Sequence, residues 1–163
     1  MPVMRRRKSN RLTKYNYSKA GSYFITICVK DRHEILALVV EDICLGTPLL
    51  ELTETGLMVE QYIVKVDEIY EMLRVDKYVI MPNHIHMIVS IIDETFECVS
   101  PTKSTLAKAI NALKSLTSRQ FGESMWQRSY HDHIIRNEAE YLRIWEYIDH
   151  NPFNWAADCY YGD

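Results

Sequence analysis

The stretch Tyr78-Val-Ile-Met-Pro-Asn-His-Ile-His-Met-Ile-Val-Ser90 determines how the rest of the chain is interpreted. Because the side chains of a strand alternate between its two faces, His84 and His86 point to the same side. The residues between and beyond them form an apolar side that can lie on a core (Ile85, Met87, Val89 and Ile91). Two neutral imidazoles on one face are a starting point for a divalent-metal site, although a lone His-x-His pair is more often structural.

Length and composition predict one domain. The chain has 163 residues, of which 47% are hydrophobic and 25% charged, enough to bury a core of ordinary size. No apolar run reaches the roughly 18 residues of a membrane span and no secretory signal is visible, so we expect a cytoplasmic protein. The four cysteines form no C-x-x-C pair, which argues against a zinc ribbon or a disulfide framework.

Charge is unevenly distributed along the chain. The net charge is −3, yet residues 1–20 contain seven basic residues and no acidic one, which leaves −10 on the remainder. Such an arm suits a segment that follows nucleic-acid phosphates, and Tyr15 and Tyr17 could stack on bases; a solvated leader without a role fits almost equally well. We therefore expect a basic N-terminal arm over residues 1–20 and a single domain over residues 21–163.

Residue patterns predict four strands and three helices. The expected strands cover residues 22–29, 76–81, 84–92 and 126–136, and the expected helices cover residues 53–73, 103–121 and 137–151. Pro82-Asn83 predicts a tight corner, residues 34–50 a loop or short hairpin, and Asn137 with Glu140 a capping box. The order β-α-β-β-α-β-α indicates an α+β fold: a ferredoxin-like split β-α-β antiparallel sheet with helices on one face and an added C-terminal helix.

The last expected helix carries two stripes of side chains. Its apolar positions follow i, i+3, i+4, i+7 spacing and would dock on the sheet (Tyr141, Ile144, Trp145 and Ile148). Arg143, Tyr147 and Asn151 are each four residues apart and form a separate line. In a chain with eleven tyrosines, an amphipathic border position is by itself the simpler interpretation of Tyr147.

Four phrases, taken together and in this order, resemble one family. Met81-Pro-Asn-His-Ile-His86 resembles the histidine signature of the HUH single-tyrosine endonucleases, and Glu146-Tyr-Ile-Asp-His-Asn-Pro152 resembles their tyrosine helix. Trp126-Gln-Arg128 and Ile134-Ile-Arg-Asn137 match the phrases that lie between these two. The similarity runs from about residue 14 to residue 155 and is closest to the REP-associated tyrosine transposases and their insertion-sequence relatives.

This resemblance implies a transposase that cuts and rejoins single-stranded DNA beside a hairpin. Tyr147, carried by the C-terminal helix, would be the nucleophile that forms a 5′-phosphotyrosine. His84, His86 and Asn151 would hold Mg²⁺ or Mn²⁺, although His150 is a neighbouring alternative to Asn151. Arg143 is a candidate cation for activating the phenol. The residues expected to contact DNA are Arg5, Arg6, Arg7, Lys8, Arg11, Arg128, Arg136 and Arg143; for Arg128 and Arg136, surface ion pairing is an equally good interpretation.

Two other functions stay open at this point. A chain that keeps the fold and the grip on a DNA hairpin without cutting would be a domesticated binding protein. A metal-dependent hydrolase of a small phosphate ester would turn over without a covalent adduct. The sequence also leaves open the DNA sequence, a monomer or a homodimer, and whether Tyr147 serves the histidine pair of its own chain.

Overall fold

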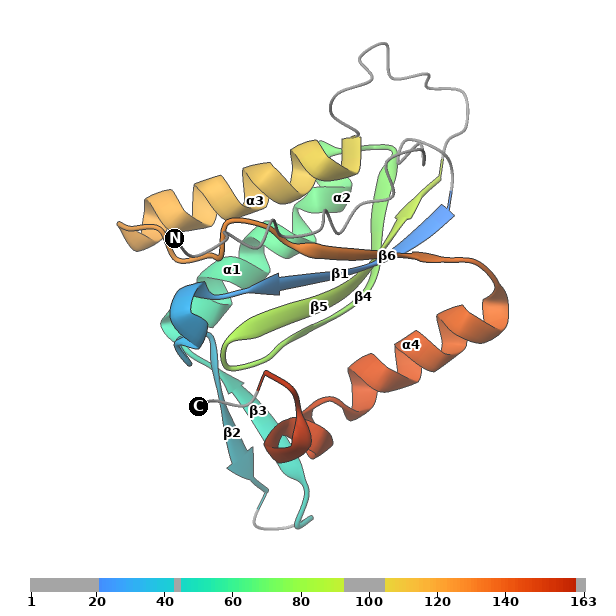
Figure 1. Cartoon of the computed structure of the whole chain (residues 1–163). Helices are drawn as coiled ribbons and strands as arrows, with labels where there is room; N and C mark the ends of the chain where they lie inside the picture. Colours follow the sequence, from blue (N-terminus) through green and yellow to red (C-terminus); the bar gives the residue numbers. More distant parts are fainter. Residues whose placement is uncertain (1–20, 43–44, 93–104, 161–163) are drawn as a thin grey trace, which may run out of the picture.

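A four-stranded antiparallel sheet forms the centre of the computed structural model, which describes residues 21–42, 45–92 and 105–160 (Figure 1). Its strands are β1 (Gly21–Cys28), β4 (Leu73–Ile80), β5 (His84–Ile91) and β6 (His131–Ile135), in the spatial order β4-β5-β1-β6. Helices connect β1 to β4 and β5 to β6, whereas a tight corner connects β4 to β5. This is the split β-α-β arrangement, so the predicted fold class is confirmed.

One face of the sheet carries the main core. Because side chains alternate along a strand, the odd-numbered residues of β1 and β5 all point to this face. They pack beneath α1 (Glu54–Val64), α2 (Val66–Ile69) and α3 (Thr105–Phe121). The strand residues of this core are fully or almost fully buried (Tyr23, Ile25, Ile27, Ile85, Met87, Val89 and Ile91).

The other face of the sheet is covered by α4 (Glu138–His150), which Figure 1 shows on the side opposite α1 and α3. A smaller buried cluster joins this helix to the sheet (Ile88, Ile135, Ile144 and Ile148). Lys77 of β4 also forms an ion pair with Asp149 and lies 4.7 Å from the centroid of the Trp145 ring. The side chains of β5 that face α4 include both members of the histidine pair.

A separate hairpin precedes α1. It consists of β2 (Ala37–Glu41) and β3 (Pro48–Leu52) and fulfils the expectation of a loop or short hairpin in this region. Thr53 fixes the hairpin to α1, because its hydroxyl donates to the Ile35 carbonyl at 2.6 Å and accepts from Gly56 N–H at 3.1 Å. Gly56 approaches so closely that a Cβ there would stand 2.0 Å from the carbonyl oxygen of Leu36.

Three predicted boundaries were wrong. The helix expected over residues 53–73 ends at Val64, continues only as the short α2, and gives way to β4 at Leu73, whose side chain is buried opposite Ile91. The second strand therefore begins three residues before the predicted start at residue 76. Of the strand expected over residues 126–136, only His131–Ile135 is regular, because the preceding residues are bound to α3 and to the end of β1 instead.

The ends of α4 agree with the prediction. The side-chain oxygen of Asn137 accepts from Glu140 N–H at 2.9 Å, and the Glu140 carboxylate accepts from Arg136 N–H at 2.8 Å. Pro152 follows Asn151 and begins a 3-10 turn, η2 (Pro152–Ala157). This turn reverses the chain, so the residues after α4 return over the sheet.

The lengths of the helices decide whether any of them could span a membrane. α3, the longest helix in the described ranges, has 17 residues. None of the helices in those ranges is both long and apolar enough to cross a bilayer.

Candidate active site

The two histidines of β5 lie beneath a protein layer. His84 and His86 are 0% and 2% exposed, so the side of β5 that carries them is covered as completely as its apolar side. α4 covers His86, and the chain after α4 covers His84, with the Tyr160 ring centroid 4.5 Å from that of His84. The centroids of the two imidazoles are themselves 4.5 Å apart.

The ring of His84 is held so that one nitrogen faces the site without a partner. Nδ1 lies 2.9 Å from the side-chain oxygen of Asn83, which can only accept, so Nδ1 carries the proton. The amide of Asn83 is itself oriented by donating to the backbone carbonyls of Arg32 and Tyr160. Nε2 of His84 is therefore a lone-pair acceptor, and it is buried with no hydrogen-bond partner among the described residues.

The ring of His86 is fixed by its neighbour on β1. Thr26 stands opposite His86 in the strand register, and its hydroxyl lies 2.8 Å from Nδ1. Phe24 stacks on the same imidazole, with centroids 5.1 Å apart and ring planes at 28°. Nε2 of His86 then points to α4, where the hydroxyl oxygen of Tyr147 lies 3.3 Å away.

Asn151 completes this cluster from the end of α4. Its side chain is 1% exposed, and its amide nitrogen donates to Asp158 at 3.3 Å. Its side-chain oxygen is buried without a partner among the described residues, as is Nε2 of His84. His150, the neighbouring alternative, lies at the surface, where its Nδ1 contacts the Glu146 carbonyl at 2.8 Å. The structure thus places Asn151, and not His150, beside the histidine pair.

Asp158 is a member of the site that the sequence did not indicate. One carboxylate oxygen of Asp158 and one nitrogen of each histidine all lie within 4.8 Å of one another. The carboxylate also accepts from Tyr160 N–H at 2.8 Å. Asp158 follows the phrases that resemble the family and belongs to no spacing pattern, so only the return of the chain through η2 could have revealed it.

Burial keeps the two imidazoles and the Tyr160 phenol of this site neutral. It lowers the pKa of His84 to about 4, against the opposing effect of Asp158, and it lowers the pKa of His86 well below the usual value, helped by His84. Burial also raises the pKa of Tyr160 to about 12. Both imidazoles therefore offer lone pairs at neutral pH, which metal coordination requires.

Tyr147 is half buried between the site and solvent, with 41% of its side chain exposed. Burial raises the pKa of its phenol, Asp158 adds to this effect, and a hydrogen bond with Asn151 opposes it. The phenol is consequently protonated in this state and needs a cation or a proton acceptor to become a nucleophile.

Comparison with known proteins gives the family. Residues 17–151 match the family described as IS200-like transposases. The chain belongs to this family. It is also 35% identical over 175 residues to an uncharacterized protein of Haemophilus influenzae (strain ATCC 51907 / DSM 11121 / KW20 / Rd), covering 96% of this chain and 94% of that relative.

A solved structure of a REP-associated tyrosine transposase bound to a REP hairpin has the same fold as this IS200-like transposase. The TM-score is 0.63 and the sequence identity 22%, over 88% of this chain and 73% of the solved chain. At this identity the likeness establishes the fold alone.

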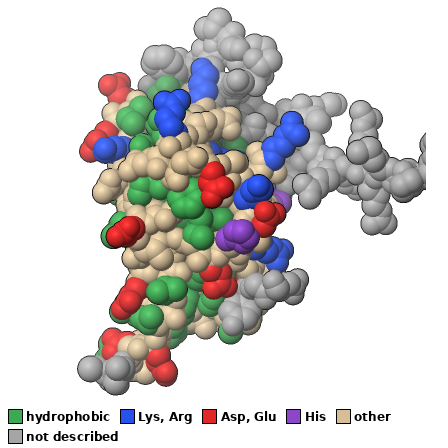
Figure 2. Space-filling view, turned by 90° about the vertical axis from the view of Figure 1, so that its left-hand side faces the viewer, with side chains coloured by type: hydrophobic (Ala, Val, Ile, Leu, Met, Phe, Trp, Pro, Cys, Tyr) green, Lys and Arg blue, Asp and Glu red, His purple; other side chains and the backbone are tan. Residues whose placement is uncertain are grey.

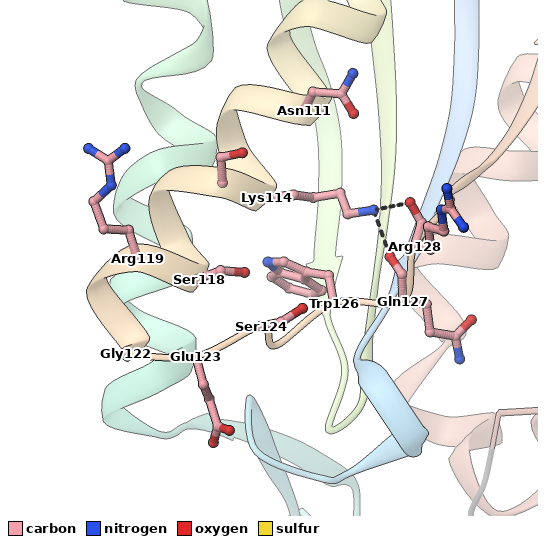
Figure 3. A pocket seen from close by; sticks show the side chains of 11 residues that line it. Asn111, Lys114, Ser118, Arg119, Gly122, Glu123, Ser124, Trp126, Gln127 and Arg128 are labelled. Atoms are coloured by element: carbon pink, nitrogen blue, oxygen red, sulfur yellow. Dashed lines mark hydrogen bonds between the residues drawn. The ribbon is translucent and has the colours of Figure 1, made fainter.

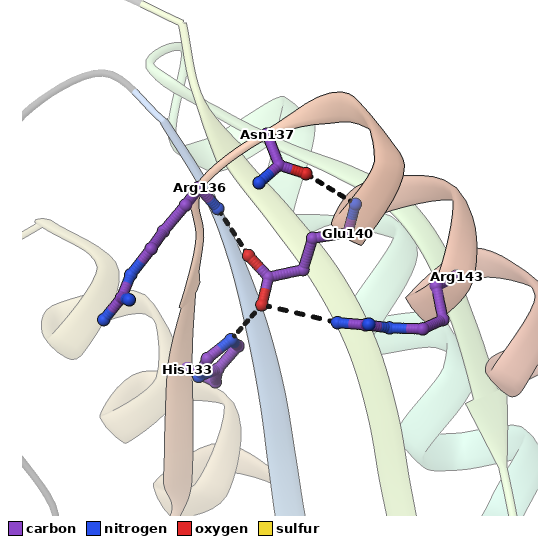
Figure 4. A network of polar contacts seen from close by, with 5 residues as sticks. All are labelled: His133, Arg136, Asn137, Glu140 and Arg143. Carbon is purple, nitrogen blue, oxygen red and sulfur yellow. Dashed lines mark hydrogen bonds and ion pairs between the residues drawn. The ribbon is translucent and has the colours of Figure 1, made fainter.

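The arginines expected to contact DNA lie in different places. Arg143 is at the surface, and its Nη2 is 3.8 Å from a Glu140 oxygen that is also bound by His133 at 2.8 Å (Figure 4). Its guanidinium is therefore engaged at the first part of α4, and its expected role beside Tyr147 stays a prediction. The side chains of Arg136 and Arg128 are exposed. The expected contacts of the basic arm (Arg5, Arg6, Arg7, Lys8 and Arg11) lie outside the described residues.

The buried histidines predict that the metal-free protein loses stability as the pH falls. His84 has a lower pKa in the folded chain, about 4, than its ordinary value of 6.5, so the unfolded chain binds more protons between these values. Its contribution is complete above pH 6.5 and decreases below it, by about 2 kcal/mol at pH 5. Urea unfolding in EDTA at pH 7, 6 and 5 measures this, and a His84→Gln variant should show a shallower dependence. Equal slopes for the two proteins would contradict the burial of this imidazole.

Proposed function

We propose that this IS200-like transposase is a metal-dependent endonuclease and strand transferase of single-stranded DNA, with Tyr147 as its nucleophile. The observation that supports this most directly is the 3.3 Å separation of the Tyr147 hydroxyl and Nε2 of His86 within one chain. A tyrosine that only bordered an amphipathic helix would have no reason to meet a buried imidazole. Tyr147 would therefore act on a phosphate held by the histidine pair of its own chain.

The proposed DNA partner rests on the family and on the fold. The REP-associated transposase that shares this fold was solved with a REP hairpin. We infer that this chain acts on a single strand next to such a hairpin. The arm over residues 1–20 supplies seven positive charges for the DNA backbone and belongs to this proposal.

The donor atoms fit a hard divalent cation. Nε2 of His84 and the side-chain oxygen of Asn151 are buried acceptors that find no partner in the described part of the chain, a condition that costs about 1–3 kcal/mol for each atom unless something binds there. With His86 and Asp158 they form a set of nitrogen and oxygen donors and no thiolate, which suits Mg²⁺ or Mn²⁺. A cation bound there would neutralise a non-bridging phosphate oxygen and so favour attack at phosphorus.

The chemistry of the tyrosine decides between transfer and hydrolysis. The phenol oxygen forms a bond to phosphorus, the bond from phosphorus to the 3′ oxygen breaks, and the phenol proton balances the new 3′ hydroxyl. The product is a 5′-phosphotyrosine ester, which keeps an activated bond to the protein. The 3′ hydroxyl of another strand can attack this ester and rejoin the DNA, a step that a water nucleophile would not permit.

Replacing Tyr147 by phenylalanine removes the nucleophile and leaves the fold. We expect Tyr147→Phe to abolish the covalent protein–DNA adduct formed with a labelled hairpin oligonucleotide and Mn²⁺, as seen on a denaturing gel. Tyr141→Phe is the matched control, because Tyr141 lies on the same helix but packs against Trp145 and not against the histidines. It should retain the adduct. An adduct formed by Tyr147→Phe would reject the proposed nucleophile, and no adduct from the unmodified protein would favour a binding protein that does not cut.

Metal affinity alone tests whether Asn151 or His150 is a metal ligand beside the histidine pair. We expect Asn151→Ala to weaken Mn²⁺ binding, measured by calorimetry without DNA, by at least about tenfold, because a buried oxygen donor is lost. His150→Ala should bind Mn²⁺ like the unmodified protein, since its ring lies at the surface. The opposite pattern would transfer the role to His150.

A further inference from the structure

A second polar groove lies on the α3 side of the sheet, outside the histidine site. It has a volume of about 750 Å³ and runs between α3 and the segment over residues 122–128 (Figure 3). One wall carries Asn111, Ser115 and Arg119 from α3, and the other carries Gln127 and Arg128. The mechanism proposed for Tyr147 does not use this groove.

The side chains of the groove suit an anion. Hydroxyl, amide and guanidinium groups line it, and Glu123 is its one acidic lining residue. Within the described residues, neither Arg119 nor Arg128 forms an ion pair with a carboxylate. This is notable on a chain whose residues after the arm carry a net charge of −10. Two arginines without carboxylate partners beside neutral donors are the groups that bind backbone phosphates.

Basic and acidic side chains are unevenly distributed over the face of the molecule shown in Figure 2. In the view of Figure 2, Lys and Arg side chains lie mainly in the upper half, whereas Asp and Glu side chains occur in both halves and dominate the lower one. An anionic strand would therefore be drawn to the upper half and repelled from the lower.

The wall that carries Arg128 is fixed to the helix. The Lys114 ammonium donates to the carbonyl of Gln127 at 2.7 Å and to those of Arg128 and Ser129 at 3.3 Å (Figure 3). One residue earlier, the indole N–H of Trp126 donates to the Thr117 hydroxyl at 2.8 Å. Lys114 thus fixes the backbone of this wall and acts as a positioning residue for Arg128, whose guanidinium lies at one end of the groove, with that of Arg119 at the other end (Figure 3).

The backbone of one groove wall is joined to the sheet that carries the histidines on its other face. Gln127 N–H donates to the carbonyl of Cys28 at 2.9 Å, and Cys28 is the register partner of His84. At the usual spacing of neighbouring strands, Gln127 and His84 are on the order of 10 Å apart.

We propose that this groove binds backbone phosphates of the single-stranded DNA flank beyond the phosphate at Tyr147, with Arg119 and Arg128 as its cations. The inference rests on the proposed function and adds to it a second, sequence-independent grip. A second grip on the strand would restrict its movement in the site and would keep the free end near the phosphotyrosine until it is rejoined.

The test measures DNA affinity in the Tyr147→Phe background, so that cutting does not interfere. The probe is a hairpin oligonucleotide with single-stranded flanks, titrated over a series of NaCl concentrations. Removing both cations (Arg119→Ala with Arg128→Ala) should weaken binding at least about tenfold and reduce the salt slope by about 1 for each arginine. Lys65→Ala, which removes an exposed cation between α1 and α2, should change neither. With flanks trimmed to the hairpin, the effect of the double substitution should disappear.

The experiment distinguishes failure of the proposed function from failure of the inference about the groove. If Tyr147→Phe protein has no affinity for the hairpin oligonucleotide, the proposed function is overturned and this inference with it. If that protein binds, and the double substitution leaves both the affinity and the salt slope unchanged, only the groove is overturned. An equal loss with full and trimmed flanks would place the arginines on the hairpin itself, which also contradicts the groove.

Discussion

β5 has apolar side chains on one side and the two histidines on the other. The site forms because α4 packs on the side that carries the histidines. The odd-numbered residues of β5 belong to the main core, whereas His84, His86 and Ile88 face the last helix and the chain that follows it. Burial of the four isoleucines that join α4 to the sheet contributes about 1.5–3 kcal/mol each. This docking positions Tyr147 over His86 and Asn151 beside His84.

Covering the site with α4 and the chain that follows it also lowers the stability of the fold. Two buried acceptors, one on His84 and one on Asn151, have no partner among the described residues, and each lowers stability by about 1–3 kcal/mol relative to a bonded atom. Burial also keeps both imidazoles in their neutral form. A sequence selected only for stability would pair or replace these groups, so their presence in one buried cluster agrees with a binding role.

Much of the fold could be predicted because it depends on local alternation and on end signals. The strand over β5, the corner at Pro82-Asn83, and the cap of α4 at Asn137 each follow from neighbouring residues. The end of α1 could not be predicted, because Leu73 suits a helix face as well as the strand where it pairs with Ile91. The irregular course before His131 depends on Lys114, a contact across the molecule that no local pattern contains.

The candidate site divides in the same way. His84, His86, Tyr147 and Asn151 were named from strand and helix spacing together with a family resemblance, and the structure brings these four side chains together. Asp158 and Tyr160 could not be named, since their position depends on the turn η2 reversing the chain after α4. The positions of Arg119 and Arg128 at the two ends of one groove likewise emerge only from the packing of α3.

The central claim is that one chain holds both halves of the site, the histidine pair and the tyrosine that meets it. Mixing two inactive variants, Tyr147→Phe and His86→Ala, tests this directly, with the covalent adduct on a labelled hairpin oligonucleotide as the readout. If each chain builds its own site, the mixture forms no adduct, although the unmodified protein does. Recovery of the adduct in the mixture would show that the tyrosine of one chain serves the histidines of another, and would contradict the contact between Tyr147 and His86.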